Sequence, residues 1–367
     1  MARLRYQDTG VDYDVMDTFK RACQVAAAKT RHGLAAHGFT EPDEVRGESA
    51  YLIETPDAYV AHVEEALGTK ILVADAVYEL TGQSFYRNVA IDNVATIVND
   101  LCSCGARSVT LAMYLATGDV SYLADETRAE DLAAGFAEAC ELAGATWGGG
   151  ETQVLKGMVT EGTAILGGSA FGRIAPKSNR IAGNVQDGDV IIFLGSSGVQ
   201  TNGLTLCRAI VDRLSDGYLT PLSDGRPYGE AILDASVIYA RFVQACQDAG
   251  IPLHYAAHMT GHGWRKLMRL NDPYVYRIDV VPKPQPVFDL IAEAAELDAG
   301  EMYGTYNMGV GFAAYVAPEH AEACLACAKA SGYEAWQAGR VSAEGDRKAV
   351  VIEPLELEYG ADSLQIR

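Results

Sequence analysis

The stretch DVIIFLGSSGVQTNGLTL (residues 189–206) joins an apolar run to a glycine-rich turn. Apolar residues recur at helical spacing from Leu204 onward, which predicts a helix capped by Thr201 or Asn202. Flexible backbone at Gly198 and free N–H groups at the helix start would suit an anion, although a plain capped turn explains the same residues. The stretch lacks both the P-loop lysine and the Rossmann G-x-G-x-x-G, so neither of those nucleotide-binding folds is supported.

The rest of the chain mixes strands and helices without strict βαβ alternation, which predicts an α+β protein. Its 367 residues exceed one ordinary core, so we expect two domains. The polar, turn-rich segment 175–189 separates them and predicts an N-terminal domain over 1–174 and a C-terminal domain over 175–367. Within the second domain, one long helix is expected over residues 228–250.

The composition restricts the partners that the chain can have. Asp and Glu number 49 against 29 Lys and Arg, a net charge of −20, which argues against nucleic-acid binding. A nucleotide substrate remains compatible, because a divalent metal can bridge carboxylates and phosphates. We find no apolar run long enough for a membrane span and no signal-peptide pattern, and the eight cysteines lack a disulfide-framework spacing. These features favour a reduced cytoplasm.

A polar strip follows the predicted helix that starts at Asp92, in the sequence DNVATIVNDLCS. At 100° per residue, Thr96 and Asn99 share a face with Asp92, opposite the apolar stripe, and Asp100 lies at the border. Asp92 also suits the helix N-cap. A carboxylate at a core edge needs a partner, so a salt bridge and a ligand role are equally open for Asp100.

Two further glycine turns carry carboxylates. The segment VEEALGTK (residues 63–70) places Glu65 at a strand end and Lys70 after a Gly-Thr turn, where Lys70 could pair with phosphate. The segment WGGGETQVLKG (residues 147–157) sets Glu151 beside three glycines, a candidate metal or nucleotide contact. A solvated hairpin end and a plain loop are the alternatives.

A third glycine turn, HMTGHGWRKLMR (residues 258–269), contains two histidines. A single histidine is more often structural, but His258 and His262 on either side of one turn are candidates for acid or base chemistry.

The order of these segments resembles the aminoimidazole ribonucleotide synthetases, the phosphoribosylformylglycinamidine cyclo-ligases of purine synthesis. The anchors run collinearly through almost the whole chain: YQDTGVDYD, LGTK, AIDNVATIVNDL, YLATG, GGET, LGSSGVQTNG, HMTGHG and EMYGTYNMGVGF. The last anchor is similar to the cyclo-ligases rather than to their wider superfamily.

The resemblance implies two α+β domains, with the N-terminal sheets of two subunits forming a barrel in a homodimer. It also implies ATP as co-substrate, Mg²⁺, and a small nucleotide substrate. ATP phosphorylates the formyl amide oxygen, the amidine nitrogen attacks the activated carbon, and phosphate leaves.

Carried over by position, the resemblance implies roles for specific residues of this chain. The expected ATP contacts are Lys70, Asp92, Asn99, Asp100, Gly149 and Glu151. The expected metal ligands are Glu65, Asp100 and Glu151. The expected substrate contacts are Gly198, Gln200, Thr201, Asn202 and Gly203, and the expected catalytic residues are His258, His262, Lys70 and Gln200.

The chain departs from the family pattern at three places. Glu65 and Ala66 replace Asp and Gly, Gln200 replaces a histidine, and His262 replaces a glycine. Because one histidine disappears and another appears, we hypothesise that His262 partly replaces the lost imidazole. The alternatives to the cyclo-ligase are a divergent paralogue that phosphorylates another amide or acid, and a nucleotide-binding protein without catalysis.

Overall fold

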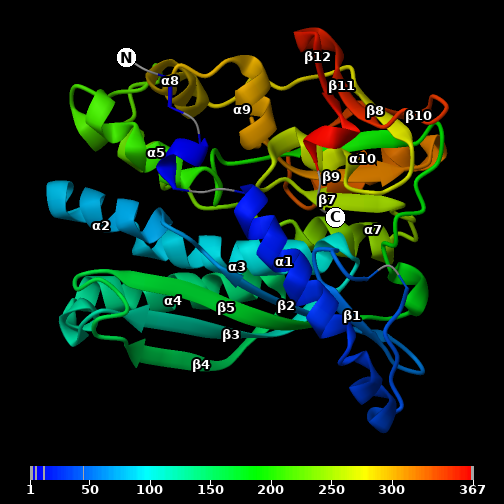
Figure 1. The fold of residues 1–367 in the computed structure, drawn as a ribbon, viewed down its shortest axis with the longest axis horizontal. Helices are drawn as coiled ribbons and strands as arrows, with labels where there is room; N and C mark the ends of the chain where they lie inside the picture. Colours follow the sequence, from blue (N-terminus) through cyan, green and yellow to red (C-terminus); the bar gives the residue numbers. More distant parts are fainter. Residues whose placement is uncertain (1–2, 5, 11–12, 44, 365–367) are drawn as a thin grey trace.

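The computed structural model describes residues 3–4, 6–10, 13–43 and 45–364, and its strands form two sheets (Figure 1). The first sheet has the order β1-β2-β5-β3-β4, with β1 (Tyr51–Glu54), β2 (Tyr59–Ala66), β3 (Arg107–Thr117), β4 (Thr146–Val154) and β5 (Ala164–Ile174). The second has the order β12-β11-β8-β10-β6-β9-β7, with β6 (Val190–Gly195), β7 (Tyr255–His258), β8 (Tyr274–Ile278), β9 (Val310–Val316), β10 (Ala335–Ala343), β11 (Ala349–Ile352) and β12 (Leu357–Gly360).

Helices precede, separate and follow these strands. The first half contains α1 (Tyr13–Ala28), α2 (Lys70–Thr81), α3 (Tyr86–Ser103) and α4 (Glu126–Ala143). The second half contains α5 (Leu204–Ala209), α6 (Tyr228–Ile232), α7 (Ala240–Asp248), α8 (Pro286–Ala295), α9 (Ala299–Thr305) and α10 (Ala321–Ala330). The sheet pairings are antiparallel except β3 with β4 and β8 with β11, which confirms the predicted α+β class. The two sheets lie on either side of residue 175, and the domain boundary there stays a prediction.

Helix α3 lies between the first sheet and the C-terminal half (Figure 1). It packs closely on β5 because Gly168 has no side chain: a Cβ there would lie 2.5 Å from the Ala112 carbonyl oxygen and 3.1 Å from Ile97 Cδ1. Ile165 and Phe171, at odd positions of the same strand, are exposed. One face of this sheet is therefore covered by helices and the other displays apolar side chains.

The structure corrects the predicted start of α3. The helix begins at Tyr86, so Asp92 is a fully buried residue of the second turn and not an N-cap. The apolar stripe had placed the helix but not its first residue, because capping and early turns carry weaker sequence signals.

The predicted long helix over residues 228–250 is wrong. The structure contains α6 and α7 with an extended segment between them. Side chains of α2 and α3 satisfy the backbone of that segment: Asn88 donates to Leu233 O, Lys70 to Asp234 O and Asn99 to Val237 O, while Asp92 accepts from Ser236 N and Asn99 from Tyr239 N. These tertiary hydrogen bonds replace the helical ones.

Helix α5 begins at Leu204 as predicted but lacks the predicted cap. Its N-cap is Gly203 in the left-handed region, and neither Thr201 nor Asn202 caps the helix. No helix in the described part of the chain is long and apolar enough to cross a membrane.

Candidate active site

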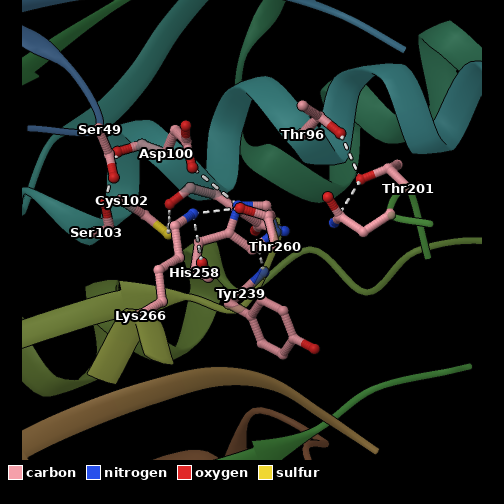
Figure 2. A network of polar contacts seen from close by, with 12 residues as sticks. Ser49, Thr96, Asp100, Cys102, Ser103, Thr201, Tyr239, His258, Thr260 and Lys266 are labelled. Atoms are coloured by element: carbon pink, nitrogen blue, oxygen red, sulfur yellow. Dashed lines mark hydrogen bonds and ion pairs between the residues drawn. The ribbon is translucent and has the colours of Figure 1, made fainter. Parts of the chain in front are cut away.

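The centre of the site is a pair of side chains that come from the two halves of the chain. Asp100, near the end of α3, meets His258, the last residue of β7, with 2.9 Å between Asp100 Oδ1 and His258 Nδ1 (Figure 2). His258 is 3% exposed. The sequence had predicted both residues as site residues but had left the partner of Asp100 open.

Burial and hydrogen bonding set the protonation of this pair. Burial is the largest single influence and would raise the pKa of Asp100, but the hydrogen bond from His258 and the positive charges of Lys266 and Arg269 together lower the pKa below its ordinary value. Burial, together with the charge of Lys266, lowers the pKa of His258 although Asp100 opposes the shift. The imidazole is therefore neutral at pH 7, donates its Nδ1–H to the ionised carboxylate, and retains Nε2 as an acceptor.

A pocket of about 280 Å³ opens beside this pair. We call it the Glu65–Asp100 pocket; its lining residues are Lys20, Glu48, Ser49, Glu65, Asp100, Thr260, Gly261, His262, Lys266, Arg269 and Leu364. It combines three carboxylates with three cationic side chains, so it suits a charged ligand better than an apolar one.

Glu65, at the end of β2, shares this pocket with Asp100. Burial and the neighbouring charge of Asp100 raise the pKa of Glu65 to about 7. Two carboxylates held close enough to repel each other are a suitable place for a divalent cation, and carboxylate oxygens are the ligands that Mg²⁺ prefers.

The third predicted metal ligand lies elsewhere. Glu151 is an exposed residue of β4, at the edge of the first sheet, and lines a different pocket together with Gly149. Within the described residues, no group of three or more His, Cys, Asp or Glu side chains is arranged to hold a metal. One chain thus brings Glu65 to Asp100 but does not bring Glu151 to them.

His262 follows the turn in the left-handed region at φ 73° and lines the Glu65–Asp100 pocket. Burial, with the charges of Arg265 and Lys266, lowers the pKa of His262 to about 4. A base of that strength is neutral at pH 7 but has little affinity for a proton, so His262 can act there mainly as a neutral hydrogen-bonding group.

Lys70, Asp92 and Asn99 are all fully buried. Lys70 Nζ lies 2.6 Å from Asp92 Oδ2 and donates to the carbonyl oxygens of Gln200 and Asp234 at 3.0 and 2.9 Å. All three predicted ATP contacts are therefore used in joining α2 and α3 to the C-terminal half. Burial of Asp92 raises its pKa even though Lys70 opposes the shift.

The glycine loop, the segment between β6 and α5 (residues 196–203), is held by hydrogen bonds from side chains of several other elements. Gln200 has φ 56°, is 2% exposed and donates through Nε2 to Tyr239 Oη at 3.2 Å. Tyr239 Oη in turn donates to Gly195 O at 2.7 Å, and Asn307 Nδ2 donates to Gly198 O at 2.8 Å. A positive φ for a glutamine is uncommon and persists because these contacts and Lys70 over-determine it.

Gly203 explains part of the EMYGTYNMGVGF motif. A Cβ on Gly203 would lie 2.1 Å from Cε1 of Tyr306, so the glycine lets the motif's tyrosine pack against the loop. At the other end of the loop, Thr96 Oγ1 donates to Thr201 Oγ1 at 3.2 Å (Figure 2). Asn202 Nδ2 also donates to Thr201 Oγ1. The loop and the Asp100–His258 pair therefore lie along the same helix, α3.

Three residues with roles in this region were not predicted: Lys266, Tyr239 and Asn307. Lys266 lies in the HMTGHGWRKLMR segment, whose two histidines alone marked it as a site. Nothing in the local sequence marks Tyr239 or Asn307 as supports of the glycine loop, because their partners lie 39 and 109 residues away.

Sequence comparison covers both halves of the chain. Residues 47–174 match the family model described as AIR synthase related protein, N-terminal domain, and residues 186–352 match the corresponding C-terminal domain. Among similar proteins, the phosphoribosylformylglycinamidine cyclo-ligase of Methanocaldococcus jannaschii is 32% identical over 92% of this chain and 91% of its own length. That of Myxococcus xanthus is 32% identical over 95% and 99%.

Solved structures share the fold at lower identity. The hydrogenase maturation protein HypE of E. coli superposes with a TM-score of 0.58 at 17% identity, over 84% of this chain and 86% of that one. PurL of T. maritima, complexed with FGAR, superposes with a TM-score of 0.58 at 15% identity, over 88% of this chain and 48% of that longer one. At these identities the likeness concerns the fold.

Proposed function

The chain belongs to the AIR synthase-related family, and on this premise we propose that it is an ATP-dependent cyclo-ligase that acts on formylglycinamidine ribonucleotide. Relatives bearing the cyclo-ligase name align over more than nine-tenths of the chain, which supports this choice. In the proposed reaction, the γ-phosphoryl group of ATP passes to the formyl amide oxygen and ADP leaves. The amidine nitrogen then attacks the activated carbon, the C–O bond breaks, and phosphate departs with that oxygen.

The observation that carries the proposal is the Asp100–His258 pair at the wall of a charged pocket. Ring closure needs a group that accepts the proton of the attacking nitrogen and a scaffold that holds the reacting ends together. The neutral His258 keeps Asp100 ionised and oriented, and its Nε2 can accept a proton. His258 is buried, so we assign it mainly a positioning role toward Asp100.

Glu65 and Asp100 are the residues of this chain that would hold Mg²⁺. Mg²⁺ is commonly bound by one or two carboxylates together with substrate phosphates and water, so two carboxylates in one pocket are a sufficient protein contribution. When bound, the ion would offset charge on the transferred phosphoryl group. Glu151 would serve a different contact from β4, together with Gly149.

The glycine loop is proposed as the grip on the nucleotide substrate, through Gly198, Thr201, Asn202 and Gly203. Gln200 keeps the loop in shape, since its side chain is bonded to Tyr239 and its carbonyl to Lys70. We therefore propose that Lys70, Asp92 and Asn99 support this loop and the segment before α7 rather than contact ATP.

The proposed homodimer would use the uncovered face of the first sheet. Val109, Ile165 and Phe171 are 40–45% exposed there. An apolar sheet face of this kind favours burial against another sheet. Light scattering on a Phe171→Glu variant tests the assignment: we expect the wild-type protein to be a dimer and the variant to shift toward monomer, whereas an unshifted variant would contradict this face.

The decisive experiment measures ADP release and product absorbance with formylglycinamidine ribonucleotide, ATP and Mg²⁺. We expect equal amounts of ADP and cyclised product, and at least a roughly hundredfold loss of turnover in Asp100→Asn, in keeping with the loss of a catalytic charge. A protein that binds ATP but releases no ADP with this substrate would refute the cyclo-ligase proposal.

A second candidate is supported by Gln200. A buried glutamine that is bonded to Tyr239 cannot exchange a proton, although a histidine is expected there in the cyclo-ligases. A divergent paralogue that phosphorylates another amide or carboxylic acid would show ATP hydrolysis only with its own substrate. A panel of amide and acid substrates, read by ADP release, separates the two candidates.

A further inference from the structure

Lys266 is a cationic side chain inside the Glu65–Asp100 pocket that none of the roles above uses. It lies in the short 3-10 helix Gly263–Met268. Its ammonium group donates to the carbonyl oxygen of His258 at 3.0 Å and to Thr260 Oγ1 (Figure 2). Two of its three N–H groups are thus directed to neutral acceptors, and no carboxylate in the described residues forms an ion pair with it.

The charge of Lys266 nevertheless acts on both carboxylates of the pocket. It lowers the pKa of Glu65 and that of Asp100, in each case against the effect of burial. Burial lowers the pKa of Lys266 itself to about 8, so the side chain is mainly protonated at pH 7. A fixed positive charge therefore already faces the place where a divalent ion would bind.

The consequence depends on the form in which the metal arrives. A free divalent ion is positive and is repelled by a nearby ammonium group, whereas a metal–ATP complex carries net negative charge and is attracted by it. The hydrogen bonds to His258 and Thr260 hold the ammonium in place, so it cannot swing away to relieve the repulsion.

We propose that Lys266 makes the Glu65–Asp100 pocket selective for a metal–nucleotide complex over the free divalent ion. The inference rests on the proposed ATP-dependent function. It assigns Lys266 as a specificity-determining residue, which favours binding of the metal together with the nucleotide over binding of the metal alone.

The test measures the affinity of the protein for Mn²⁺, a paramagnetic probe, by electron paramagnetic resonance and calorimetry. Mn²⁺ is titrated first alone and then together with a non-hydrolysable ATP analogue. Removing the charge in Lys266→Met should tighten binding of Mn²⁺ alone about tenfold and weaken binding of the Mn²⁺–analogue complex about tenfold, as expected for charges in one partly hydrated pocket. Lys266→Arg keeps the charge and should behave like the wild-type protein in both titrations.

Lys20→Met is the matched control, because Lys20 lines the same pocket from α1 but is exposed. Solvent screening should limit its effect in both titrations to less than about threefold. A Lys266→Met variant that binds both probes more weakly, or both unchanged, would overturn the proposal, since a purely structural role cannot give opposite signs. Thermal unfolding of each variant identifies one that has not folded, and Lys266→Gln then repeats the test.

Failure of this inference can be told from failure of the proposed function. Mn²⁺ binding without nucleotide requires no turnover, so opposite shifts in a protein that lacks cyclo-ligase activity would refute the function and keep the inference. Full cyclo-ligase activity without opposite shifts in the two Lys266→Met titrations would keep the proposed function and refute the inference about Lys266.

Discussion

The buried ion pair between Lys70 and Asp92 allows a sharp stability prediction. Both side chains are 0% exposed and their charged atoms are 2.6 Å apart. Lys70→Met removes the ammonium group and leaves an uncompensated carboxylate in the interior, together with the carbonyl oxygens of Gln200 and Asp234. We expect the free energy of unfolding to fall by about 3–5 kcal/mol, the usual cost of removing one member of a buried pair.

Two effects set the size of this loss in the free energy of unfolding. The unpaired carbonyls alone would cost roughly 1–3 kcal/mol each if water cannot reach them. Protonation limits the cost of the carboxylate, because burial already raises the pKa of Asp92. The double variant Lys70→Met/Asp92→Asn carries no buried charge and keeps an acceptor for Ser236, so its loss should be smaller than the sum of the single losses by at least about 1 kcal/mol.

Equilibrium unfolding in urea measures these differences, and hydrogen exchange of residues 233–239 reports whether the segment between α6 and α7 loosens first. The control removes a surface pair: Arg173→Met breaks the contact with Asp57, in which the side chains are 50% and 74% exposed, and should change stability little. If Lys70→Met costs no more than Arg173→Met, the reasoning about the buried pair is refuted.

Three further changes test other parts of the structure. In the presence of a chelator, Glu65→Gln should stabilise the protein at pH 8 by up to about 3 kcal/mol but not at pH 4. The pKa of Glu65 is about 7 in the folded protein against an ordinary 4.5, so the stability of the wild-type protein falls as pH rises from 4.5 through 7. Equal shifts of the urea midpoint at both pH values would contradict this. Asn99→Ala removes the partners of Val237 O and Tyr239 N and should cost about 1–3 kcal/mol, seen as a lower urea midpoint and faster exchange of the Tyr239 amide; unaltered exchange would count against it. His262→Asn, which tolerates the left-handed backbone, should lower turnover without changing its pH dependence between pH 6 and 8, because the pKa of His262 is about 4; unchanged turnover would remove His262 from the mechanism.

Local patterns in the sequence predicted the elements that depend on near neighbours. The 3.6-residue periodicity located α3, although not its first residue. The glycine after α4 ends that helix in the left-handed region, as glycines commonly do at helix C-termini. The motifs identified the family and indicated that Asp100, His258 and Glu65 belong to one site, which the structure brings together around two of the glycine turns.

Other features required the tertiary structure, and Asp92 is the clearest example. Its sequence position suits a helix cap or an ATP contact, yet the folded chain gives it Lys70 and Ser236 as partners. Likewise, helix propensity over residues 228–250 was overridden because α2 and α3 offer hydrogen bonds to the backbone in their middle.

The sequence by itself determined the α+β class, the family and the set of residue types available for chemistry, since these depend on local periodicity and on motif order. Only the tertiary structure decided which polar residues face the pocket and which are consumed in joining the halves. The glycine loop shows the reason: its shape depends on Lys70, Tyr239 and Asn307, which lie 130, 39 and 109 residues from their partners in it. Contacts over such separations leave no periodic trace in the chain, so the burial of Lys70 and the positive φ of Gln200 become visible only in the folded protein.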